Sequence, residues 1–352
     1  MKNIVIFTST LGAGGAEKQA ALLAQLLTKQ YKVHFVALYG DLEQSDYVLS
    51  ILNKAKVNIY LLTGSQRAKF RAYAKILKDN NIVCAFNYLT KCDFWGAIIE
   101  KQCRVEKIYN GIRSSRLEIY KTILEFISHN LVADGTIFNS YSAQKYFCAK
   151  GFNKHKSIVI PNYFPAIHKP IERITQEPVR IIIVSRFVAS KDYKTAIKTI
   201  SLLKKERRHI IFDICGYGPL ESQIRKWVKL YDIEDLVEYH IHPNNIPELL
   251  RKANIYLSTS IFEGTSNSIM EAMNWSLPVV ATNVGDNNYL VRTGENGFLH
   301  NVGDACGLTQ SLIKLIDSND LRKSMGFRGN EILRKYYSTE IFIERYIKLI
   351  EG

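Results

Sequence analysis

The sequence predicts an α/β protein made of two doubly wound domains, each a parallel sheet covered by helices. Short apolar strands rich in β-branched residues alternate with amphipathic helices along almost the whole chain. The alternation stops once, in a polar stretch that holds four of the eight prolines (Pro161, Pro165, Pro170 and Pro178). Because proline cannot continue a helix or a central strand, this stretch reads as a linker. A length of 352 residues also favours two domains over one.

The first domain is expected to span residues 1–165. Its strands are predicted near residues 4–8, 33–38, 57–61, 82–86, 105–109, 135–138 and 158–160. Its helices are predicted near 16–29, 46–54, 66–79, 91–102, 117–131 and 142–150.

A linker over 166–178 and a second domain over 179–337 follow, with a final helix in residues 338–352. Strands are predicted near 179–185, 210–215, 237–240, 254–258 and 278–281, and helices near 191–206, 220–231, 246–252, 268–275, 305–317 and 321–336. Two such domains in tandem imply a cleft between them. Ligands of open α/β sheets bind beyond the carboxyl ends of the strands, so the loops after strands are the candidate sites.

Charge is unevenly divided along the chain. Residues 1–165 hold 22 Lys and Arg against 11 Asp and Glu, a net of 22 − 11 = +11, whereas the remainder has 25 − 22 = +3. A basic surface of this kind attracts anionic lipid, phosphorylated substrates or nucleic acid, and no nucleic-acid recognition module accompanies it. The six cysteines show no metal-ligand spacing, and no apolar run approaches the roughly 20 residues of a membrane span. We therefore expect a cytoplasmic protein with reduced thiols.

The most informative stretch is 258–282, which is predicted to be a strand end, a polar loop, a short helix and a second strand. Glu263 lies in the loop and Glu271 in the helix. Small and hydroxyl-bearing residues lie between them: Gly264, Thr265, Ser266, Asn267 and Ser268. A helix start leaves N–H groups free and attracts phosphate, and ionised carboxylates accept hydrogen bonds from paired sugar hydroxyls. The alternative is an ordinary capped helix.

Three further loops follow predicted strands. Arg186 and Lys191 lie five residues apart beside a helix start, where they could neutralise a diphosphate. Gly216-Tyr217-Gly218-Pro219 forms either a simple turn or a close backbone contact with a ligand. The loop with Gly12, Gly14 and Gly15 resembles a dinucleotide fingerprint only weakly, because Glu17 replaces the third glycine. An NAD-dependent oxidoreductase is therefore disfavoured.

Taken in order, these motifs resemble the retaining glycosyltransferases of family 4, which have the GT-B fold. The resemblance covers Gly14-Gly15-Ala16-Glu17, Ser185-Arg186 to Lys191, Gly216-x-Gly218-Pro219, Phe262-Glu263-Gly264 to Glu271 and Pro278-Val279-Val280-Ala281. It implies two Rossmann-like domains facing a central cleft, with the helix in 338–352 returning to the N-terminal domain. It also implies a nucleotide-sugar donor, such as a UDP- or GDP-sugar, in the second domain.

The resemblance also implies roles for individual residues. Arg186, Lys191 and Glu263 would be catalytic, the first two neutralising the diphosphate, and no metal cofactor is expected because the chain has no Asp-x-Asp. The implied donor-binding residues are Gly15, Gly216, Glu263, Gly264, Thr265, Ser266, Asn267, Ser268 and Glu271, with the nucleobase near Gly216 and residues 240–242. Gly14 and Arg113 would lie on the acceptor side, Arg113 in a region where many relatives have a histidine.

The acceptor is expected to be a polyprenyl-pyrophosphate-linked glycan in surface polysaccharide assembly, such as O-antigen or capsule. The basic first half favours an anionic membrane surface, at the inner face of the cytoplasmic membrane. The segment 66–78 reads either as a basic amphipathic helix lying on that surface or as an ordinary helix packed on its sheet. A sugar-nucleotide epimerase and a non-catalytic sugar-binding protein are the alternative functions.

Overall fold

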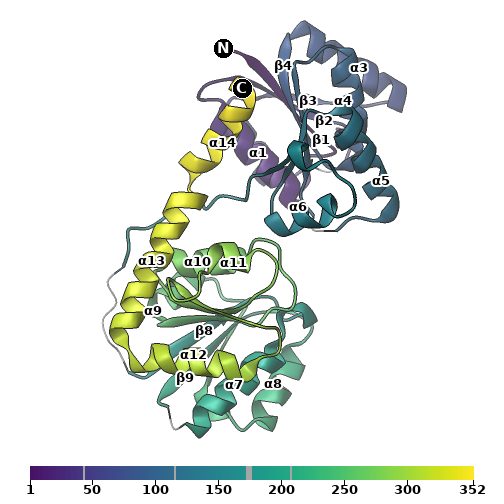
Figure 1. The fold of residues 1–352 in the computed structure, drawn as a ribbon. Helices are drawn as coiled ribbons and strands as arrows, with labels where there is room; N and C mark the ends of the chain where they lie inside the picture. The colour runs from purple at the N-terminus through teal and green to yellow at the C-terminus, as the bar shows by residue number, and fades with distance from the viewer. Residues whose placement is uncertain (43, 115, 172–176, 207) are drawn as a thin grey trace. The chain divides into compact units, whose positions relative to one another are not determined.

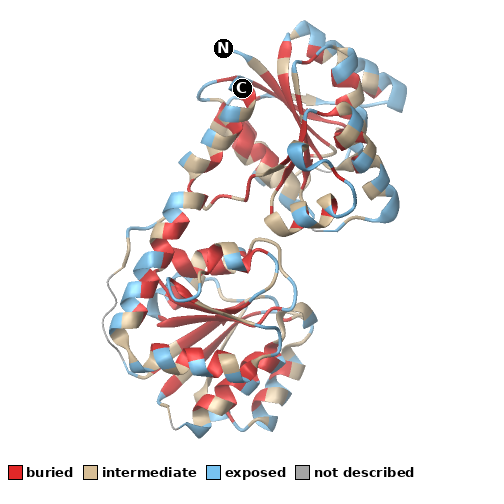
Figure 2. Ribbon diagram, in the orientation of Figure 1, coloured by how far each residue is buried: buried red, intermediate tan, exposed pale blue. Residues whose placement is uncertain are grey.

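The computed structural model describes residues 1–42, 44–114, 116–171, 177–206 and 208–352. The chain divides into two compact units. The first unit comprises Met1–Asn162 together with Glu340–Gly352, and the second comprises Tyr163–Thr339. In each unit the central strands of the sheet are buried, and helices cover the sheet (Figures 1 and 2).

The described part of the first unit holds a seven-stranded sheet of order β3-β2-β1-β4-β5-β6-β7, with all neighbours parallel. Its strands are β1 (Asn3–Thr8), β2 (Lys32–Ala37), β3 (Asn58–Leu61), β4 (Ile82–Tyr88), β5 (Lys107–Ile112), β6 (Gly135–Phe138) and β7 (Ser157–Val159). The helices are α1 (Gly15–Leu27), α2 (Asp46–Lys54), α3 (Gln66–Asp79), α4 (Thr90–Gln102), α5 (Ile119–Ile127), α6 (Tyr141–Cys148) and α14 (Thr339–Glu351). A π-helical turn, η1 (Ser128–Val132), and a 3-10 turn, η2 (Lys154–Lys156), complete the unit.

The C-terminal helix α14 packs on the first unit, as predicted. Its inward face buries Phe342, Tyr346 and Ile350. Its last turn is held by polar contacts, because the Lys107 ammonium donates to the carbonyl of Ile350 (3.1 Å) and the Tyr31 hydroxyl to Glu351 (2.8 Å). A cation at the carbonyl end also complements the helix dipole.

The second unit is built on a parallel sheet of order β10-β9-β8-β11-β12-β13 in its described residues. The strands are β8 (Val179–Val184), β9 (Ile210–Gly216), β10 (Val237–Ile241), β11 (Ile255–Ser258), β12 (Val279–Thr282) and β13 (Gly297–His300). The helices are α7 (Tyr193–Lys205), α8 (Glu221–Leu230), α9 (Ile246–Lys252), α10 (Asn267–Asn274), α11 (Asn287–Leu290), α12 (Ala305–Asp317) and α13 (Asn319–Tyr337), with 3-10 turns η3 (Ala189–Lys191) and η4 (Glu234–Leu236).

Part of the predicted linker 166–178 is bound to the second unit. The backbone N–H of His168 donates to the Asn274 side chain (2.7 Å), and that of Ile171 to the Ser276 hydroxyl (3.1 Å). Residues 172–176 of the predicted linker lie outside the described residues.

Several elements differ from the sequence prediction, among them the short helix α11, which was not predicted. Strand β13 was not predicted, because its four residues, Gly297–His300, include no β-branched residue. Its pairing is tight, since a Cβ on Gly297 would lie 2.0 Å from the carbonyl oxygen of Val279. The single helix expected over 117–131 is instead α5 followed by the π-helical turn η1.

Residues 66–78, predicted to lie either on a membrane or on their own sheet, belong to helix α3, which packs on the first sheet. Tyr73 and Leu77 are buried, and the Tyr73 ring stacks on Phe7 with centroids 4.0 Å apart. Its cations Arg67, Arg71, Lys75 and Lys78 are exposed. The apolar face of α3 is therefore covered by its own sheet, as in an ordinary α/β helix. Among the described residues no helix is both long and apolar enough to cross a bilayer.

A buried polar network lies between β4, β5 and α4 in the first unit. The Glu100 carboxyl accepts hydrogen bonds from the Tyr73 hydroxyl (2.5 Å) and the Asn87 amide (2.9 Å). The amide of Asn110 donates to the Ser128 hydroxyl (2.8 Å), which donates to the carbonyl of Asp93 (2.7 Å). Burial raises the pKa of Glu100 to about 7, despite the two donors that lower it.

We expect Glu100 to make folding stability fall as pH rises. The Glu100 carboxyl has an ordinary pKa of 4.5, so between 4.5 and about 7 the folded chain holds a proton that the unfolded chain has lost. The contribution is at most about 1.4 kcal/mol per pH unit across this window, and it is constant above it.

The measurement is urea unfolding of the wild type and Glu100→Gln at several pH values. The variant should gain stability relative to the wild type as pH rises from 4.5 to 7. His34 and His129, whose pKa burial lowers to about 4, act in the opposite sense but are common to both proteins. Parallel pH profiles of the two proteins would contradict this role.

Candidate functional site

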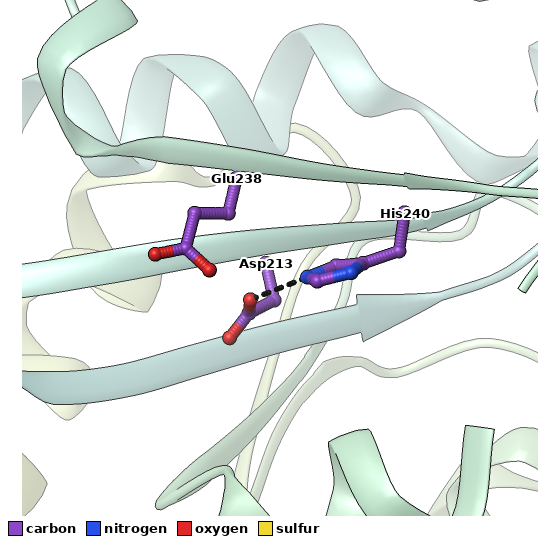
Figure 3. A group of neighbouring side chains, drawn as sticks. All are labelled: Asp213, Glu238 and His240. Carbon is purple, nitrogen blue, oxygen red and sulfur yellow. Dashed lines mark hydrogen bonds and ion pairs between the residues drawn. The ribbon is translucent and has the colours of Figure 1, made fainter. Parts of the chain in front are cut away.

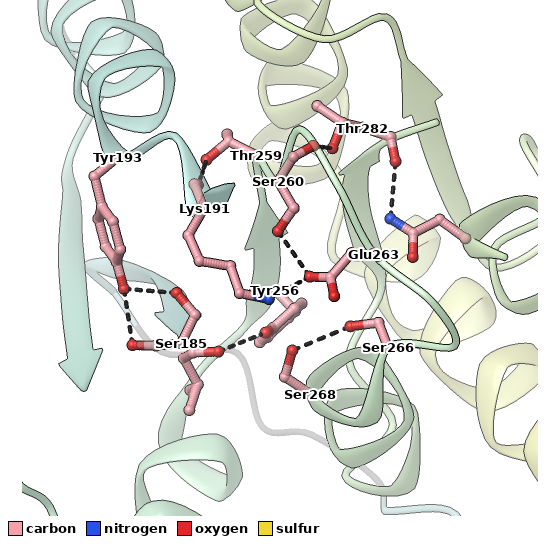
Figure 4. A network of polar contacts seen from close by, with 12 residues as sticks. Ser185, Lys191, Tyr193, Tyr256, Thr259, Ser260, Glu263, Ser266, Ser268 and Thr282 are labelled. Carbon is pink, nitrogen blue, oxygen red and sulfur yellow. Dashed lines mark hydrogen bonds and ion pairs between the residues drawn. The ribbon is translucent and has the colours of Figure 1, made fainter. Parts of the chain in front are cut away.

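The candidate site lies where the strand order of the second sheet reverses, between β8 and β11. In open α/β sheets, ligands bind beyond the carboxyl ends of the strands at such a reversal. The first loop contains the 3-10 turn Ala189–Lys191, and the second contains Glu263 (Figure 4). The backbone N–H of Ile261 donates to the carbonyl of Ser190 (2.9 Å), so the loops are bonded to each other.

Lys191 and Glu263 form an ion pair across these two loops. The Lys191 ammonium lies 2.5 Å from Glu263 Oε1, and the Ser260 hydroxyl donates to the same oxygen at 2.8 Å. Their side chains are only 17% and 13% exposed. The backbone of Lys191 is held by Thr259, whose hydroxyl donates to the Lys191 carbonyl (3.0 Å). Two residues that were predicted to share a site therefore lie in contact.

The loop that carries Glu263 is shaped by a close approach of Gly285. Gly285 has φ of +55°, and a Cβ there would lie 2.2 Å from the carbonyl oxygen of Glu263. The next residue, Asp286, is buried, and its N–H donates to the carbonyl of Gly264 (3.1 Å). The Thr265 hydroxyl donates to the Asp286 carboxylate at 3.2 Å. The predicted contact residues Gly264 and Thr265 are thus fixed by the segment after β12.

Helix α10 begins directly after this loop, and no side chain caps its first turn. The Ser266 hydroxyl pairs with that of Ser268 (3.2 Å) instead of accepting from the backbone, and Asn267 is exposed. By contrast, the start of α7 is capped by the Asp192 carboxylate, which accepts from the N–H of Thr195 (3.2 Å). An anion is therefore favoured at α10 and disfavoured at α7.

Glu271 lies one turn into α10, and burial raises its pKa. The hydroxyl of Tyr256, from β11, interacts electrostatically with Glu271 and with Glu263 and donates to the carbonyl of Val184 (3.2 Å). The two carboxylates that were predicted to bracket the ligand thus both lie near one buried tyrosine.

A cavity of about 300 Å³ opens beside this loop pair, at the ends of β8, β9 and β10. It is lined by Val184, Ser185, Arg186, Gly216, Tyr217, His242, Pro243, Asn244 and Ile246. The rings of Tyr217 and His242 stack with centroids 4.4 Å apart. Gly216 has φ of +151°, and a Cβ on it would lie 1.9 Å from the carbonyl oxygen of Ser185, so only glycine fits there. Arg186 is exposed at this cavity and is not part of the Lys191 ion pair.

The predicted glycines of the first unit lie at the start of α1. Gly15 is the first residue of the helix, and Gly14 precedes it in an extended conformation. A Cβ on Gly14 would lie 2.3 Å from a carboxylate oxygen of Glu17, which also accepts from the Thr10 hydroxyl (2.9 Å). Glycine at 14 therefore leaves space for Glu17.

Arg113 holds the C-terminal helix within the first unit. Its guanidinium donates to the hydroxyl of Tyr346 on α14 (3.0 Å) and lies 4.6 Å from the centre of the Tyr88 ring. Both tyrosines are buried. These contacts assign Arg113 a structural role, which the sequence did not suggest.

Three side chains of the described residues could together ligate a metal: Asp213, Glu238 and His240 (Figure 3). They project from β9 and β10, and the His240 ring lies 2.8 Å from the Asp213 carboxylate. The guanidinium of Arg180 bonds both Asp213 oxygens (3.0 and 2.7 Å) and also contacts Glu238. A fixed cation already neutralises this cluster, so the chemistry of the set does not fit a metal.

Sequence reasoning missed Tyr256, Ser260, Thr259 and Asp286 at this site. In the sequence, Tyr256 resembles an apolar core residue of a strand, and Ser260 resembles an ordinary loop residue. Asp286 directly follows Gly285. A carboxylate after such a glycine was the one available signal.

Comparisons with known proteins find similarity to glycosyltransferases. Residues 166–331 match the family model described as Glycosyl transferases group 1. The chain is 25% identical to an uncharacterized glycosyltransferase of Haemophilus influenzae, over 98% of this chain and 99% of that protein. It is 26% identical to the poly(ribitol-phosphate) alpha-N-acetylglucosaminyltransferase of Staphylococcus aureus, over 60% of this chain and 42% of that enzyme.

Solved structures establish the fold. HepE from Anabaena, solved with UDP bound, superposes with a TM-score of 0.78 at 16% identity, covering 99% of both chains. The predicted fold class is therefore confirmed: an α/β protein with the two Rossmann-like units of GT-B glycosyltransferases.

We expect Gly285→Ala to disturb the site, whereas Gly264→Ala should be tolerated. An alanine at 285 meets the Glu263 backbone and a left-handed φ, while a Cβ at 264 meets nothing within 4 Å. Gly285→Ala should lower the free energy of unfolding by more than about 1 kcal/mol. Chemical unfolding gives the free energy of unfolding of each variant. Equal values for the two variants would contradict the close contact between Gly285 and the Glu263 backbone.

Proposed function

We propose that this protein is a retaining glycosyltransferase that moves a hexose-type sugar from a nucleoside diphosphate donor to an acceptor hydroxyl. The observation that carries the proposal is the Lys191–Glu263 pair at the strand-order reversal, beside the uncapped start of α10. The matched family model spans Arg186, Lys191, Glu263 and Glu271 and supports the same conclusion.

The leaving group explains why cations are needed. When the bond between the sugar C1 and the β-phosphate oxygen breaks, negative charge develops on the diphosphate. Lys191, Arg186 and the first N–H groups of α10 stabilise that charge without a metal ion. The acceptor oxygen forms the new bond to C1 on the face that the diphosphate leaves, and its proton goes to the departing phosphate oxygen. No protein nucleophile is required for this retaining route.

In the chain without donor, Lys191 and Glu263 neutralise each other. An arriving diphosphate attracts the Lys191 ammonium, which leaves Glu263 with acceptor capacity for sugar hydroxyls. The ion pair thus keeps both groups in place before the donor binds. Ser260 continues to position the carboxylate through its 2.8 Å hydrogen bond.

The cavity beside the ion pair suits the nucleoside part of the donor. Tyr217 and His242 offer stacked rings at its wall, and Gly216 allows close backbone approach. Glu271 would accept hydrogen bonds from the two ribose hydroxyls. HepE, a protein with the same fold, binds UDP.

For the acceptor, we propose a lipid-linked glycan of surface polysaccharide assembly, of the polyprenyl-pyrophosphate type, at the inner face of the cytoplasmic membrane. The staphylococcal relative is named for transfer to poly(ribitol-phosphate), an anionic polymer. The net charge of +11 in residues 1–165 supports an anionic acceptor on the first unit.

We expect Lys191→Ala and Glu263→Gln each to lower kcat/KM by roughly 100-fold or more, because each removes a charge at the reacting centre. Lys194→Ala is the matched control, since Lys194 is exposed on α7 three residues away. Thermal shift against UDP-, GDP- and ADP-sugars first identifies the donor. Release of the nucleoside diphosphate with acceptor present then measures turnover, and melting temperatures confirm folding.

Two results would replace this proposal. Conversion of a nucleotide sugar into another nucleotide sugar without an acceptor would indicate an epimerase. Tight donor binding with full turnover in Lys191→Ala and Glu263→Gln would remove the ion pair from the chemistry.

A second expectation concerns pH. Because burial raises the pKa of Glu271 above the ordinary 4.5, its carboxylate becomes protonated at a higher pH than an exposed glutamate. A protonated Glu271 accepts fewer hydrogen bonds, so donor affinity should fall as pH decreases. Glu271→Gln should bind donor more weakly at neutral pH and lose this part of the pH dependence. Calorimetric titration of both proteins measures it, and identical pH profiles would contradict the ribose contact.

A further inference from the structure

Helix α5 presents an apolar face to solvent and a charged residue to the interior. Ile119, Tyr120, Ile123 and Phe126 are exposed, Ile119 to 82%, and the following turn adds Leu131 at 78%. These positions follow helical spacing along one side of α5. The only buried residue of α5 is Glu125. This is the reverse of the usual arrangement for a helix on an α/β sheet.

The inward face is polar because it completes the network of the first unit. Glu125 and Asp93 are both buried, and burial raises the pKa of each carboxyl. In the next turn, the ring of His129 bonds the Thr136 hydroxyl at 2.8 Å. The orientation of α5 is therefore set by buried hydrogen bonds. A rotation that buried the apolar side would expose these groups and break their pairing.

Cations surround the apolar face at both ends. At the N-terminal end, the Lys121 ammonium lies 5.5 Å from the centre of the Tyr120 ring, and the exposed Lys91 belongs to α4, which packs against α5. At the C-terminal end, Asn130 bonds residues 151 and 153, so the segment that carries the exposed Lys150 and Lys154 is bonded to the turn that carries Leu131.

Acidic groups are few around this face. Within the described residues of 116–131 and 150–154, the exposed carboxylate is Glu118, which is paired with Lys121 at 3.0 Å. The apolar residues Ile119, Tyr120, Ile123, Phe126 and Leu131, with the cations Lys91, Lys121, Lys150 and Lys154, are called the α5 face below.

Charge complementarity selects the partner. A second copy of the chain would bring an identical set of cations against this face, in a unit whose residues 1–165 carry a net +11. An anionic lipid surface instead attracts the cations and receives the apolar side chains below its headgroups. Tyr120 has the amphipathic ring that suits the boundary between headgroups and acyl chains.

We propose that the α5 face docks on an anionic lipid bilayer, with the helix lying in the plane of the headgroups. Helix α5 follows β5 on the carboxyl side of the first sheet, so docking holds that edge of the sheet near the membrane. This deepens the proposed function, which supplies the lipid-linked acceptor, and it assigns the membrane contact to α5 in place of α3.

The test is co-sedimentation of the full chain with sucrose-loaded vesicles of 3:1 phosphatidylcholine and phosphatidylglycerol, compared with phosphatidylcholine alone. The wild type should bind the anionic vesicles and lose affinity as salt is raised. Ile119→Ser with Ile123→Ser should lower the partition coefficient roughly tenfold or more. Leu230→Ser, an exposed leucine on α8 of the second unit, is the control and should bind as the wild type does.

A second pair of variants tests the charges. Lys150→Glu with Lys154→Glu should weaken binding to anionic vesicles by roughly tenfold or more. Arg71→Glu with Lys75→Glu, exposed positions on α3, makes the same change in net charge elsewhere in the first unit and should weaken binding far less.

Three results would overturn the proposal. One is failure of the wild type to bind anionic vesicles, and another is equal binding by the Ile119 and Ile123 double variant. The third is a dimer in sedimentation equilibrium that this variant abolishes, which would assign the face to a second copy. Donor affinity of the same variant, measured by thermal shift, should equal that of the wild type. This measurement distinguishes a failure of membrane docking from a failure of the proposed donor chemistry.

Discussion

The ion pair between Lys191 and Glu263 is the interaction on which the organisation of the candidate site depends. Removing two charges from water is costly, and the cost is offset only when each charge is paired and further hydrogen-bonded. Here Ser260 supplies the additional bond to Glu263, and Thr259 fixes the backbone of Lys191. The pair can therefore exist only because β8 and β11 bring their loops together at the reversal of strand order.

Around that pair, close contacts between backbone segments allow only glycine at two positions. Gly285 and Gly216 both lie where a Cβ would collide with a carbonyl oxygen of a neighbouring loop. The starts of the two helices differ in charge. The Asp192 carboxylate caps the start of α7, whereas the N-cap residue of α10 makes no capping hydrogen bond through its side chain. An anion that binds at the start of α10 therefore does not have to displace a capping carboxylate.

The first unit uses buried polarity in a different way. Its carboxyls Asp93, Glu100 and Glu125 lie in the interior, where burial raises the pKa of each. Their hydrogen bonds set the orientation of α4 and α5 against the sheet, and Arg113 holds α14 through Tyr346. As a result, α5 exposes an apolar face that has cations at both ends.

The sequence by itself determined the α/β alternation and the two-unit division, and it predicted several residues of the second-unit site, because periodicity and position after a strand are local properties. Lys191 and Glu263 could be placed at one edge from the chain alone, since parallel strands share their carboxyl ends. Only the tertiary structure decided that they pair, that Arg113 binds Tyr346 and that α3 is covered while α5 is not. These facts depend on which distant side chain faces each residue. A helix such as α5 turns its apolar side outward only because Glu125 and His129 find buried partners, and periodicity does not reveal partners contributed by other elements.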